Sequence, residues 1–370
     1  MEGSNGVSKD AQAEKAHRNG PTTAVYTPST ILLTGGAGFI GSHVVEHLVH
    51  TYSSYKIVVL DKLDYCSAIE NLSSVQDKKN FKFVRGDIRS KNLVDYLLRS
   101  EEVDTILHFA AATHVDNSFH SSITFTGNNV VGTHVLLESA REYGGIKRFV
   151  HVSTDEVYGG ETNFENEEAV MAPTNPYACT KAAAELICRG YAASFNLPVV
   201  ITRGNNVYGE HQFPDKLIAK TCCLLARGRK CYIHGDGSHS RSYVYVKDMA
   251  KAFAIILHQG KIGEVYNVGC NVEKTNLQVI RDLLKVYGHE KEEEEYIEYA
   301  EDRAINDRRY RIDSTKLKQL GWECEVSWEE GLRRTAAWYS DSKNLRRWSN
   351  LEQGLVPHPS LENSHRSEDI

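Results

Sequence analysis

The first half of the chain alternates short apolar runs with longer amphipathic segments. Nearly continuous apolar runs are typical of strands buried on both faces, and helices between them favour a parallel sheet covered on both sides. We therefore predict an α/β fold of the Rossmann type, a doubly wound parallel sheet. The predicted strands are 31–33, 56–60, 81–84, 105–109, 148–152 and 198–202.

Amphipathic segments between these strands predict a helix that starts at Gly38 and further helices at 128–142 and 177–194. After residue 204 the alternation loosens, and the remaining helices are expected at 215–228, 276–287 and 328–345. We interpret this later part as a smaller C-terminal α/β substrate lobe over the carboxyl ends of the strands.

The domain division follows from these patterns. Residues 29–203 are expected to form the Rossmann domain, with part of 245–270 returning to it. The substrate-binding lobe is expected to comprise 204–244 and 271–350. Both ends, 1–28 and 351–370, are polar and are predicted to be disordered tails.

Composition narrows the class of protein. The 370 residues include 43 basic and 49 acidic side chains, a formal net charge of −6, which argues against a protein that follows a nucleic-acid backbone. No run approaches the ~18–20 apolar residues that span a bilayer, so no membrane partner is expected. The polar N-terminus and eight cysteines without a CxxC pair indicate reduced thiols in a cytoplasmic protein.

A glycine-rich loop follows the first predicted strand. Gly35, Gly38 and Gly41 have the GxxGxxG spacing that lets a backbone approach a pyrophosphate at a helix N-terminus. Asp61 ends the second strand, where a carboxylate accepts hydrogen bonds from ribose hydroxyls and repels a 2′-phosphate. The pattern thus predicts NAD as the cofactor and favours it over NADP.

Another motif competes for the same helix. His43, Glu46 and His47 match the HxxEH zinc pattern. Because this helix already opens a nucleotide-binding loop and no third ligand is evident, we interpret the two histidines as exposed helix-surface residues and expect no metal.

A proton-transfer centre is predicted at Tyr177 and Lys181. Their YxxxK spacing places both side chains on one helix face, where an ammonium group favours a phenolate and makes the tyrosine a base. Six YxxxK pairs occur in the chain, but only this one opens a helix behind the fifth strand. That strand ends in Thr154-Asp155-Glu156, which brings a hydroxyl and two carboxylates to the ligand crevice; a turn or helix cap is the alternative interpretation of the acidic pair.

These motifs together resemble the extended short-chain dehydrogenase/reductase family, and within it the nucleotide-sugar 4,6-dehydratases of the dTDP-glucose type. The resemblance covers roughly residues 28–345 and extends to segments 110–116, 213–218 and 307–310. Epimerases and decarboxylases share the glycine loop and the Thr-Tyr-Lys set. The acidic pair Asp155-Glu156 distinguishes the dehydratases from relatives that only epimerise.

The resemblance implies a reaction and a set of roles. Tyr177 would take the C4 hydroxyl proton as a hydride passes to NAD, Glu156 would remove the C5 proton, and Asp155 would protonate the departing C6 hydroxyl. The hydride then returns to C6 and a proton returns to C5, which gives a 4-keto-6-deoxy sugar and regenerates NAD. The cofactor-binding residues implied are Gly35, Gly38, Phe39, Ile40, Gly41, Asp61, Asp87, Ile88, Ala110, Ala111, Tyr177 and Lys181.

Substrate binding is implied for Thr154 and Asn206, and for the cations Lys216, Arg241 and Arg308 on the diphosphate side. Any single arginine among these is alternatively a surface charge. The chain departs from bacterial-type dehydratases at 241–243 and 304–306, which leaves the choice between dTDP-glucose and UDP-glucose open. An epimerase, a decarboxylase and a non-catalytic NAD-binding scaffold remain alternatives. The family also implies a homodimer that pairs helices 128–142 and 177–194.

Overall fold

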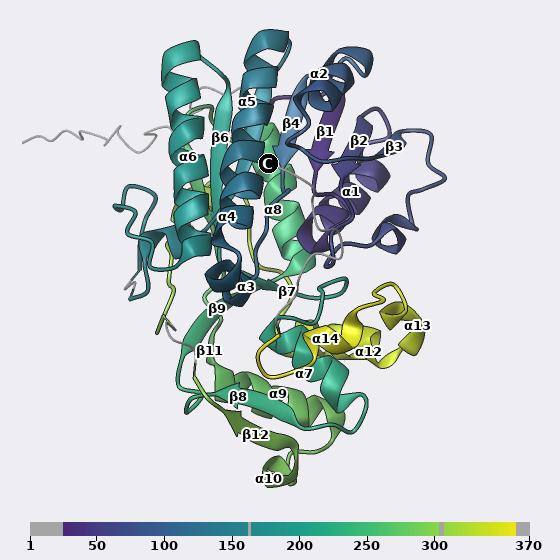
Figure 1. Ribbon diagram of the computed structural model, residues 1–370, viewed down its shortest axis with the longest axis vertical. Coiled ribbons are helices and arrows are strands. Elements are labelled where there is room, and N and C mark those ends of the chain that lie inside the picture. The colour runs from purple at the N-terminus through teal and green to yellow at the C-terminus, as the bar shows by residue number, and fades with distance from the viewer. Residues whose placement is uncertain (1–24, 162–163, 303–306, 360–370) are drawn as a thin grey trace, which may run out of the picture.

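Seven parallel strands form the central sheet, which confirms the predicted doubly wound α/β fold (Figure 1). The structure is a computed structural model that describes residues 25–161, 164–302 and 307–359. Across the sheet the order is β10-β6-β5-β4-β1-β2-β3. Strands β1 to β3 are added toward one edge and β4 onward toward the other, so the strand order reverses between β1 and β4. Such a reversal opens a ligand crevice at the carboxyl ends of the strands. The strands are β1 Thr30–Thr34, β2 Lys56–Asp61, β3 Phe81–Arg85, β4 Thr105–His108, β5 Arg148–Thr154, β6 Val199–Gly204 and β10 Val265–Val268.

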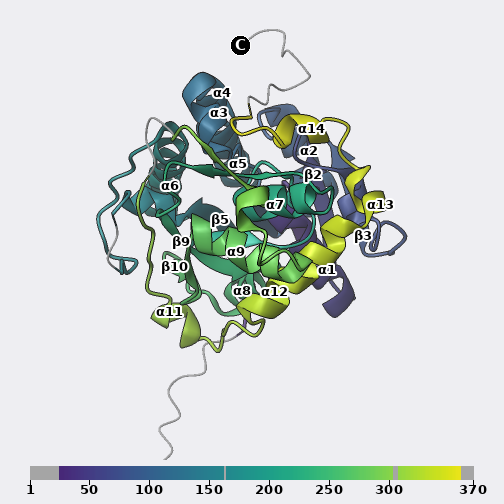
Figure 2. The same ribbon diagram turned by 90° about the horizontal axis from the view of Figure 1, so that it is seen from below.

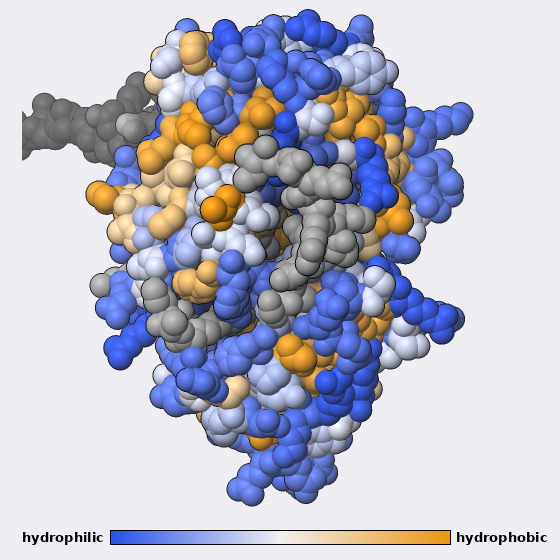
Figure 3. Space-filling model, viewed as in Figure 1, coloured by the Kyte–Doolittle hydropathy of each residue, from blue (hydrophilic) through white to orange (hydrophobic). Residues whose placement is uncertain are grey.

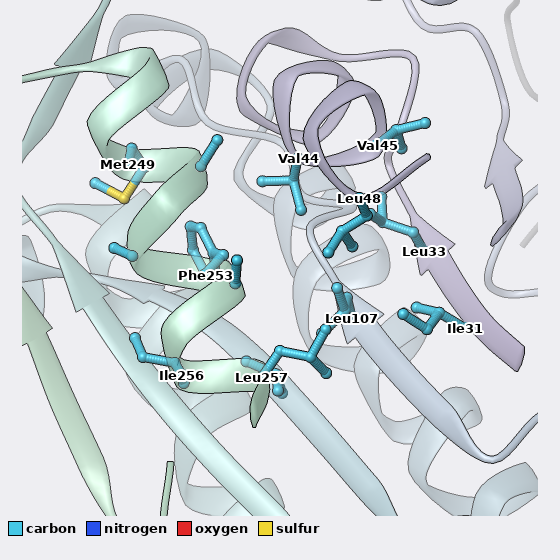
Figure 4. Packing of buried hydrophobic residues seen from close by; sticks show 14 of the residues in the cluster. Ile31, Leu33, Val44, Val45, Leu48, Leu107, Met249, Phe253, Ile256 and Leu257 are labelled. Carbon is cyan, nitrogen blue, oxygen red and sulfur yellow. The ribbon is translucent and has the colours of Figure 1, made fainter. Parts of the chain in front are cut away.

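Helices cover both faces of this sheet because alternate side chains of the central strands point to opposite sides. Leu33 of β1 packs with Val44 and Leu48 of one helix and with Phe253 and Leu257 of another, and Figure 4 shows these side chains meeting over the strands. Full burial of such a side chain contributes about 1.5–3 kcal/mol. The helices of this face are α1 Phe39–Thr51 and α8 Val246–Gln259.

The opposite face carries Leu32, which packs against three further helices. A π-helical turn, Thr126–Val131, leads into the helix over 132–143. The segment predicted as a single helix at 128–142 is therefore divided between the two. These helices are α2 Lys91–Ser100, α5 Gly132–Tyr143 and α6 Pro176–Phe195. The short α3 Val115–His120 and α4 Ser122–Phe125 lie between α2 and α5 in the chain and pack on α6.

The second lobe lies below the carboxyl ends of the strands in Figure 1, and the same lobe faces the viewer in Figure 2. It contains two small sheets, β7 Asn206–Tyr208 with β9 Ser240–Tyr245 and β11 Glu273–Thr275, and β8 Cys231–His234 with β12 Ile297–Ala300. Its helices are α7 Leu217–Leu225, α9 Asn276–Tyr287, α10 Glu293–Tyr296, α12 Trp328–Ser340, α13 Ser342–Leu345 and α14 Leu351–Gly354. The helix α11 Thr315–Lys318 packs on β10 of the main sheet.

Both segments predicted to be disordered, 1–28 and 351–370, are folded in the part that the structure describes. The hydroxyl groups of Tyr26 and Thr105 share a hydrogen bond of 2.7 Å, and the Arg148 guanidinium lies over the Tyr26 ring. Residues 25–28 therefore pack on the sheet. At the other end α14 forms within 351–359, and Leu355 is fully buried. Backbone contacts add to these side chains, since the Tyr26 N–H donates to the His258 carbonyl oxygen and the Lys220 ammonium group to that of Val356, both at 2.9 Å. Residues 1–24 and 360–370 lie outside the described residues.

The prediction that all cysteines are reduced is wrong for one pair. Cys270 and Cys324 form a disulfide between the end of β10 and the loop before α12, with their Cα atoms 6.2 Å apart. Fifty-four positions separate them in sequence, so only the fold brings them together. The other six cysteines carry free thiols. Among the described residues, no helix is both long and apolar enough to cross a membrane.

Candidate active site

A cavity of about 850 Å³ lies at the carboxyl ends of the strands, between the sheet and the second lobe. The glycine-rich loop, the ends of β2, β4, β5 and β6, and the first turn of α6 contribute to its wall, as do β8, β9 and α7 of the second lobe. Its size and position match a site for a dinucleotide together with a second ligand. All the residues predicted to bind the cofactor line it.

The glycine-rich loop leaves room for a ligand only because it lacks side chains. Gly35 has a φ of +73°, and a Cβ atom there would lie 2.6 Å from the backbone nitrogen of Ala110. A Cβ on Gly41 would lie 2.3 Å from the carbonyl oxygen of Gly35. The helix α1 starts after Gly38 without a side-chain cap, so its first N–H groups are available to an anion.

Asp61 at the end of β2 is buried and is held in one orientation. Its carboxylate accepts hydrogen bonds from the backbone N–H of Ala37 at 2.9 Å and of Leu63 at 2.8 Å, and from the Ser67 hydroxyl at 3.3 Å. Burial raises the pKa of this carboxyl group, while the two backbone donors act in the opposite direction. The position is suited to a ribose, and a 2′-phosphate would place a second negative charge against it.

Tyr177 and Lys181 lie one turn apart at the start of α6, and both are buried and line the cavity. The Lys181 ammonium group donates to the Val152 carbonyl oxygen at 2.5 Å, and burial lowers its pKa to about 8. Burial and the negative charge of Glu156 raise the pKa of the Tyr177 phenol, although its contact with Thr154 acts in the opposite direction. Lys181 is not among the groups that shift the pKa of Tyr177 here, and its role beside the phenol stays a prediction.

Thr154 is the last residue of β5, and a 3₁₀ turn, Asp155–Tyr158, follows it. The Thr154 hydroxyl accepts the N–H of Glu156 at 3.3 Å and donates to Asp155 Oδ1 at 3.2 Å. Thr154 and Glu156 line the cavity, whereas Asp155 is 2% exposed and lies just behind them. The alternative of a simple cap accounts for the Thr154 hydroxyl, while the buried Asp155 and the half-buried Glu156 each bond a different asparagine.

The two carboxyl groups differ in their surroundings. Burial and the charge of Glu156 raise the pKa of Asp155 to about 7, and burial also raises the pKa of Glu156. Asn205 donates to Asp155 Oδ2 at 2.6 Å, and Asn175 donates to Glu156 Oε2 at 3.0 Å. Each carboxyl group therefore has its own amide partner, and a pair with separate partners can take opposite roles in proton transfer.

Sequence reasoning missed both asparagines. Asn175 caps α6 by accepting the N–H of Ala178 at 2.9 Å, and its position before Pro176 is a recognisable helix-start signal. Asn205 directly precedes the predicted Asn206, but no pattern marks its contact with Asp155, because β5 and β6 meet only in the sheet.

The predicted substrate residues fall into two groups. Asn206, Lys216 and Arg241 line the cavity, and the Arg241 guanidinium lies 4.8 Å from the centre of the Tyr310 ring. Arg308 is exposed and is not among the cavity-lining residues, so the structure does not bring it to the site. The Arg308 backbone N–H donates to the Gly160 carbonyl oxygen at 3.1 Å, and its carbonyl oxygen accepts the Ser240 N–H at 3.0 Å, while the side chain is exposed.

The histidines of the HxxEH motif are not both exposed as predicted. His43 is 4% exposed, with its Nε2 3.0 Å from the Glu210 carbonyl oxygen, and its ring stacks on His211 at 4.6 Å. The second lobe covers this side of α1, which the sequence does not show. Within the described part of the chain, no three His, Cys, Asp or Glu side chains gather as a metal site.

Comparison with known proteins adds to this geometry. Residues 32–335 match the family described as GDP-mannose 4,6 dehydratase. The human dTDP-D-glucose 4,6-dehydratase is 46% identical over 333 residues, which cover 89% of this chain and 94% of that protein. The crystal structure of dTDP-glucose 4,6-dehydratase from Bacillus anthracis in complex with NAD is 40% identical, with a TM-score of 0.79, and the match covers 87% of this chain and 99% of the other.

A plant protein is also similar. The Arabidopsis thaliana trifunctional UDP-glucose 4,6-dehydratase/UDP-4-keto-6-deoxy-D-glucose 3,5-epimerase/UDP-4-keto-L-rhamnose-reductase is 52% identical over 343 residues, or 91% of this chain. The match covers 51% of the plant protein, so the chain spans about half the length of this relative.

Proposed function

The chain belongs to the GDP-mannose 4,6-dehydratase family, and from this premise we propose that it is an NAD-dependent hydro-lyase acting on a nucleotide-diphosphate hexose. The substrate is UDP-glucose or dTDP-glucose, and the product is the 4-keto-6-deoxy sugar. The observation that carries this proposal is the pair Asp155 and Glu156, a buried and a half-buried carboxyl group on one turn with separate amide partners. A nucleotide-sugar epimerase or decarboxylase has no step that needs this pair.

The cavity fits NAD. Gly35 and Gly41 leave space that a Cβ atom would fill, the first turn of α1 presents N–H groups to a pyrophosphate, and Asp61 faces the place of a ribose. Further along the cavity Ala110 and Ala111 leave room beside Tyr177. When bound, NAD supplies a positively charged hydride acceptor and then a hydride donor. A positive charge beside Tyr177 also opposes the upward shift of the phenol pKa that the chain alone produces.

Three side chains each carry out one proton transfer in this proposal. Tyr177 takes the proton of the C4 hydroxyl, with the Thr154 hydroxyl in contact with the phenol and the Lys181 ammonium group one helical turn away. Glu156 removes the proton at C5, which the new C4 ketone makes acidic. Asp155 gives its proton to the C6 hydroxyl, so the C6–O bond breaks and water leaves. A raised pKa keeps Asp155 partly protonated near neutral pH, as an acid requires.

The nucleotide diphosphate occupies the second lobe in this proposal. Lys216 and Arg241 line that part of the cavity and neutralise the diphosphate, and Asn206 lies toward the sugar. Arg308 is not assigned a role, because it is exposed away from the cavity. The higher identity to the plant UDP-glucose 4,6-dehydratase favours uracil over thymine at the end of the site.

The proposal is tested by incubating the purified protein with NAD and either UDP-glucose or dTDP-glucose. Formation of a 4-keto-6-deoxy sugar, identified by mass spectrometry after reduction with borodeuteride, is the expected result. Formation of UDP-galactose would show an epimerase, and formation of a pentose from UDP-glucuronate would show a decarboxylase. Binding of NAD without turnover of any nucleotide sugar would support the non-catalytic scaffold.

We also propose a homodimer in the cytoplasm. Exposed apolar side chains gather on one side of the Rossmann domain, over α5 and α6 in Figure 3. Ile123 of α4, Val131 of the π-helical turn before α5 and Leu186 of α6 are 74%, 48% and 57% exposed, and pairing of two copies would remove them from water. The six free thiols agree with a reducing compartment, whereas the Cys270–Cys324 bond does not. Microscopy of a fluorescent fusion tests the location.

A further inference from the structure

Asn205 occupies the junction where β6 ends and β7 begins. Its backbone N–H donates to the Val268 carbonyl oxygen of β10 at 3.0 Å, so its position is fixed by the strand next to β6. The residue is 5% exposed and lines the cavity. A buried amide at a cavity wall needs partners for both of its ends, and the nearest carboxyl group belongs to Asp155.

The two oxygens of the Asp155 carboxyl group have different neighbours. Asn205 Nδ2 lies 2.6 Å from Oδ2, and Thr154 Oγ1 lies 3.2 Å from Oδ1. An amide N–H can only donate, so Oδ2 is held as an acceptor. The Thr154 hydroxyl donates to Oδ1 but can turn and accept instead, so when the carboxyl group is protonated, its proton belongs on Oδ1. That oxygen lies on the side of Thr154, which lines the cavity where a sugar would bind.

The Asn205 side-chain amide packs against Gly269. A Cβ atom added at Gly269 would lie 2.2 Å from Asn205 Oδ1, so the amide packs directly on the glycine backbone. No larger residue fits at 269 without moving Asn205. The three residues follow neighbouring strands, with Asp155 after β5, Asn205 after β6 and Gly269 after β10. Gly269 contacts the Asn205 amide, which in turn bonds the Asp155 carboxyl group.

We propose that Asn205 is the positioning residue of the general acid: it fixes the Asp155 carboxyl group so that the transferable proton faces the C6 hydroxyl. This inference rests on the proposed dehydration, since only elimination of water needs such an acid. Asn205 does not take part in oxidation at C4, which depends on Tyr177, Lys181 and Thr154. Its loss should therefore slow one half of the reaction and spare the other.

The experiment separates the two halves in single-turnover reactions of the NAD-loaded enzyme with UDP-glucose or dTDP-glucose. Oxidation is followed by NADH absorbance, and elimination by the 4-keto-6-deoxy product. Asn205→Leu removes the amide donor while keeping a similar volume, and Gly269→Ala displaces the amide without changing it. Both variants should slow elimination by about 10- to 100-fold, the effect of losing one hydrogen bond to a charged group, and NADH should accumulate.

A pH profile distinguishes positioning from a general loss of structure. Asn205 holds the pKa of Asp155 down, so Asn205→Leu should move the alkaline limb of the elimination rate to higher pH. Asn267→Leu is the matched control, because Asn267 is a fully buried asparagine of β10 that bonds Tyr158 and not Asp155. In this control the ratio of elimination to oxidation should stay at the wild-type value.

The inference is overturned if oxidation and elimination fall by the same factor in Asn205→Leu and Gly269→Ala, or if the alkaline limb does not move. Should one variant fail to fold, the other decides, since they alter different residues. If the wild-type protein forms no 4-keto-6-deoxy sugar, the proposed function and this inference both fail. If the wild type forms the product and the variants form it at the wild-type rate, only the inference fails.

Discussion

Asp61 and Ala37 are joined by a hydrogen bond of 2.9 Å from the Ala37 backbone N–H to the Asp61 carboxylate. The bond connects the end of β2 to the glycine-rich loop after β1, twenty-four positions away. The carboxylate placed to bind a ribose therefore also holds the loop that would bind the pyrophosphate. Ligand selection and loop geometry depend on the same side chain.

Replacement of Asp61 tests this double role. Asp61→Asn keeps the shape but removes the charge, and it should weaken NAD binding by about 1.5–3 kcal/mol, the range for a hydrogen bond to a charged group. The preference for NAD over NADP should fall as well, because the 2′-phosphate no longer meets a carboxylate. Titration of the apoprotein with both cofactors, followed by tryptophan fluorescence, gives the two affinities. An unchanged ratio of the affinities would contradict the assignment of Asp61.

Glu156→Gln separates proton removal at C5 from oxidation at C4. The amide keeps the size of the side chain but cannot accept the C5 proton, so product formation should fall by about 10²–10⁴-fold. NADH should still form when the nucleotide sugar is added, since Tyr177 and Lys181 are unchanged. Glu168→Gln, on an exposed residue of the same connection, is the control and should behave as wild type. Product release at the wild-type rate would exclude Glu156 as the base.

The elimination step should lose rate as the pH rises through about 7. Asp155 acts as the acid only when protonated, and its pKa is raised to about 7, so its protonated fraction falls above that pH. Lys181, with a pKa lowered to about 8, keeps its charge to a higher pH, so oxidation should decline later. Single-turnover rates of NADH formation and of product formation across this range measure both limbs. One shared alkaline limb for the two half-reactions would contradict the assignment of Asp155.

Gly35→Ala should damage both stability and cofactor binding. The positive φ of +73° disfavours alanine, and the added Cβ would lie 2.6 Å from the Ala110 nitrogen, so the free energy of unfolding should fall by more than about 1 kcal/mol. Gly190→Ala in α6 is the matched control, with no atom within 4 Å of its added Cβ. That variant should gain about 0.5–1 kcal/mol, since alanine is the better helix former. Urea unfolding of both proteins measures the difference.

The proposed dimer predicts a change of mass for a single surface substitution. Leu186→Asp places a charge in the exposed apolar face of α6, so the dimer should dissociate into monomers. Val286→Asp on α9 introduces the same charge at an exposed valine of the second lobe and should leave the mass unchanged. Sedimentation velocity gives the mass of each. A monomeric wild-type protein would refute the dimer.

Local patterns were enough to predict much of the fold and the reacting groups. Buried strands are apolar because both of their faces are covered, and this marks β1 to β6 in the sequence. The glycine spacing and the residue at the end of β2 mark a dinucleotide loop because each requirement lies within a few residues. Thr154, Asp155 and Glu156 are adjacent in the chain, and Tyr177 and Lys181 lie within one helical turn. Spacing alone did not select them, since six YxxxK pairs occur, but their place behind the fifth strand and the family resemblance did.

What depends on distant parts of the chain could be decided only by the tertiary structure. Asn205 reaches Asp155 across fifty positions, Cys270 meets Cys324, and the second lobe buries His43, because contacts between strands and lobes leave no periodic signal. Arg308 is exposed and does not line the cavity, which a charged residue in a sequence does not reveal. The sequence thus determined which groups are available for the chemistry. Burial in the fold decided their protonation, since the cost of removing a charge from water depends on everything packed around it.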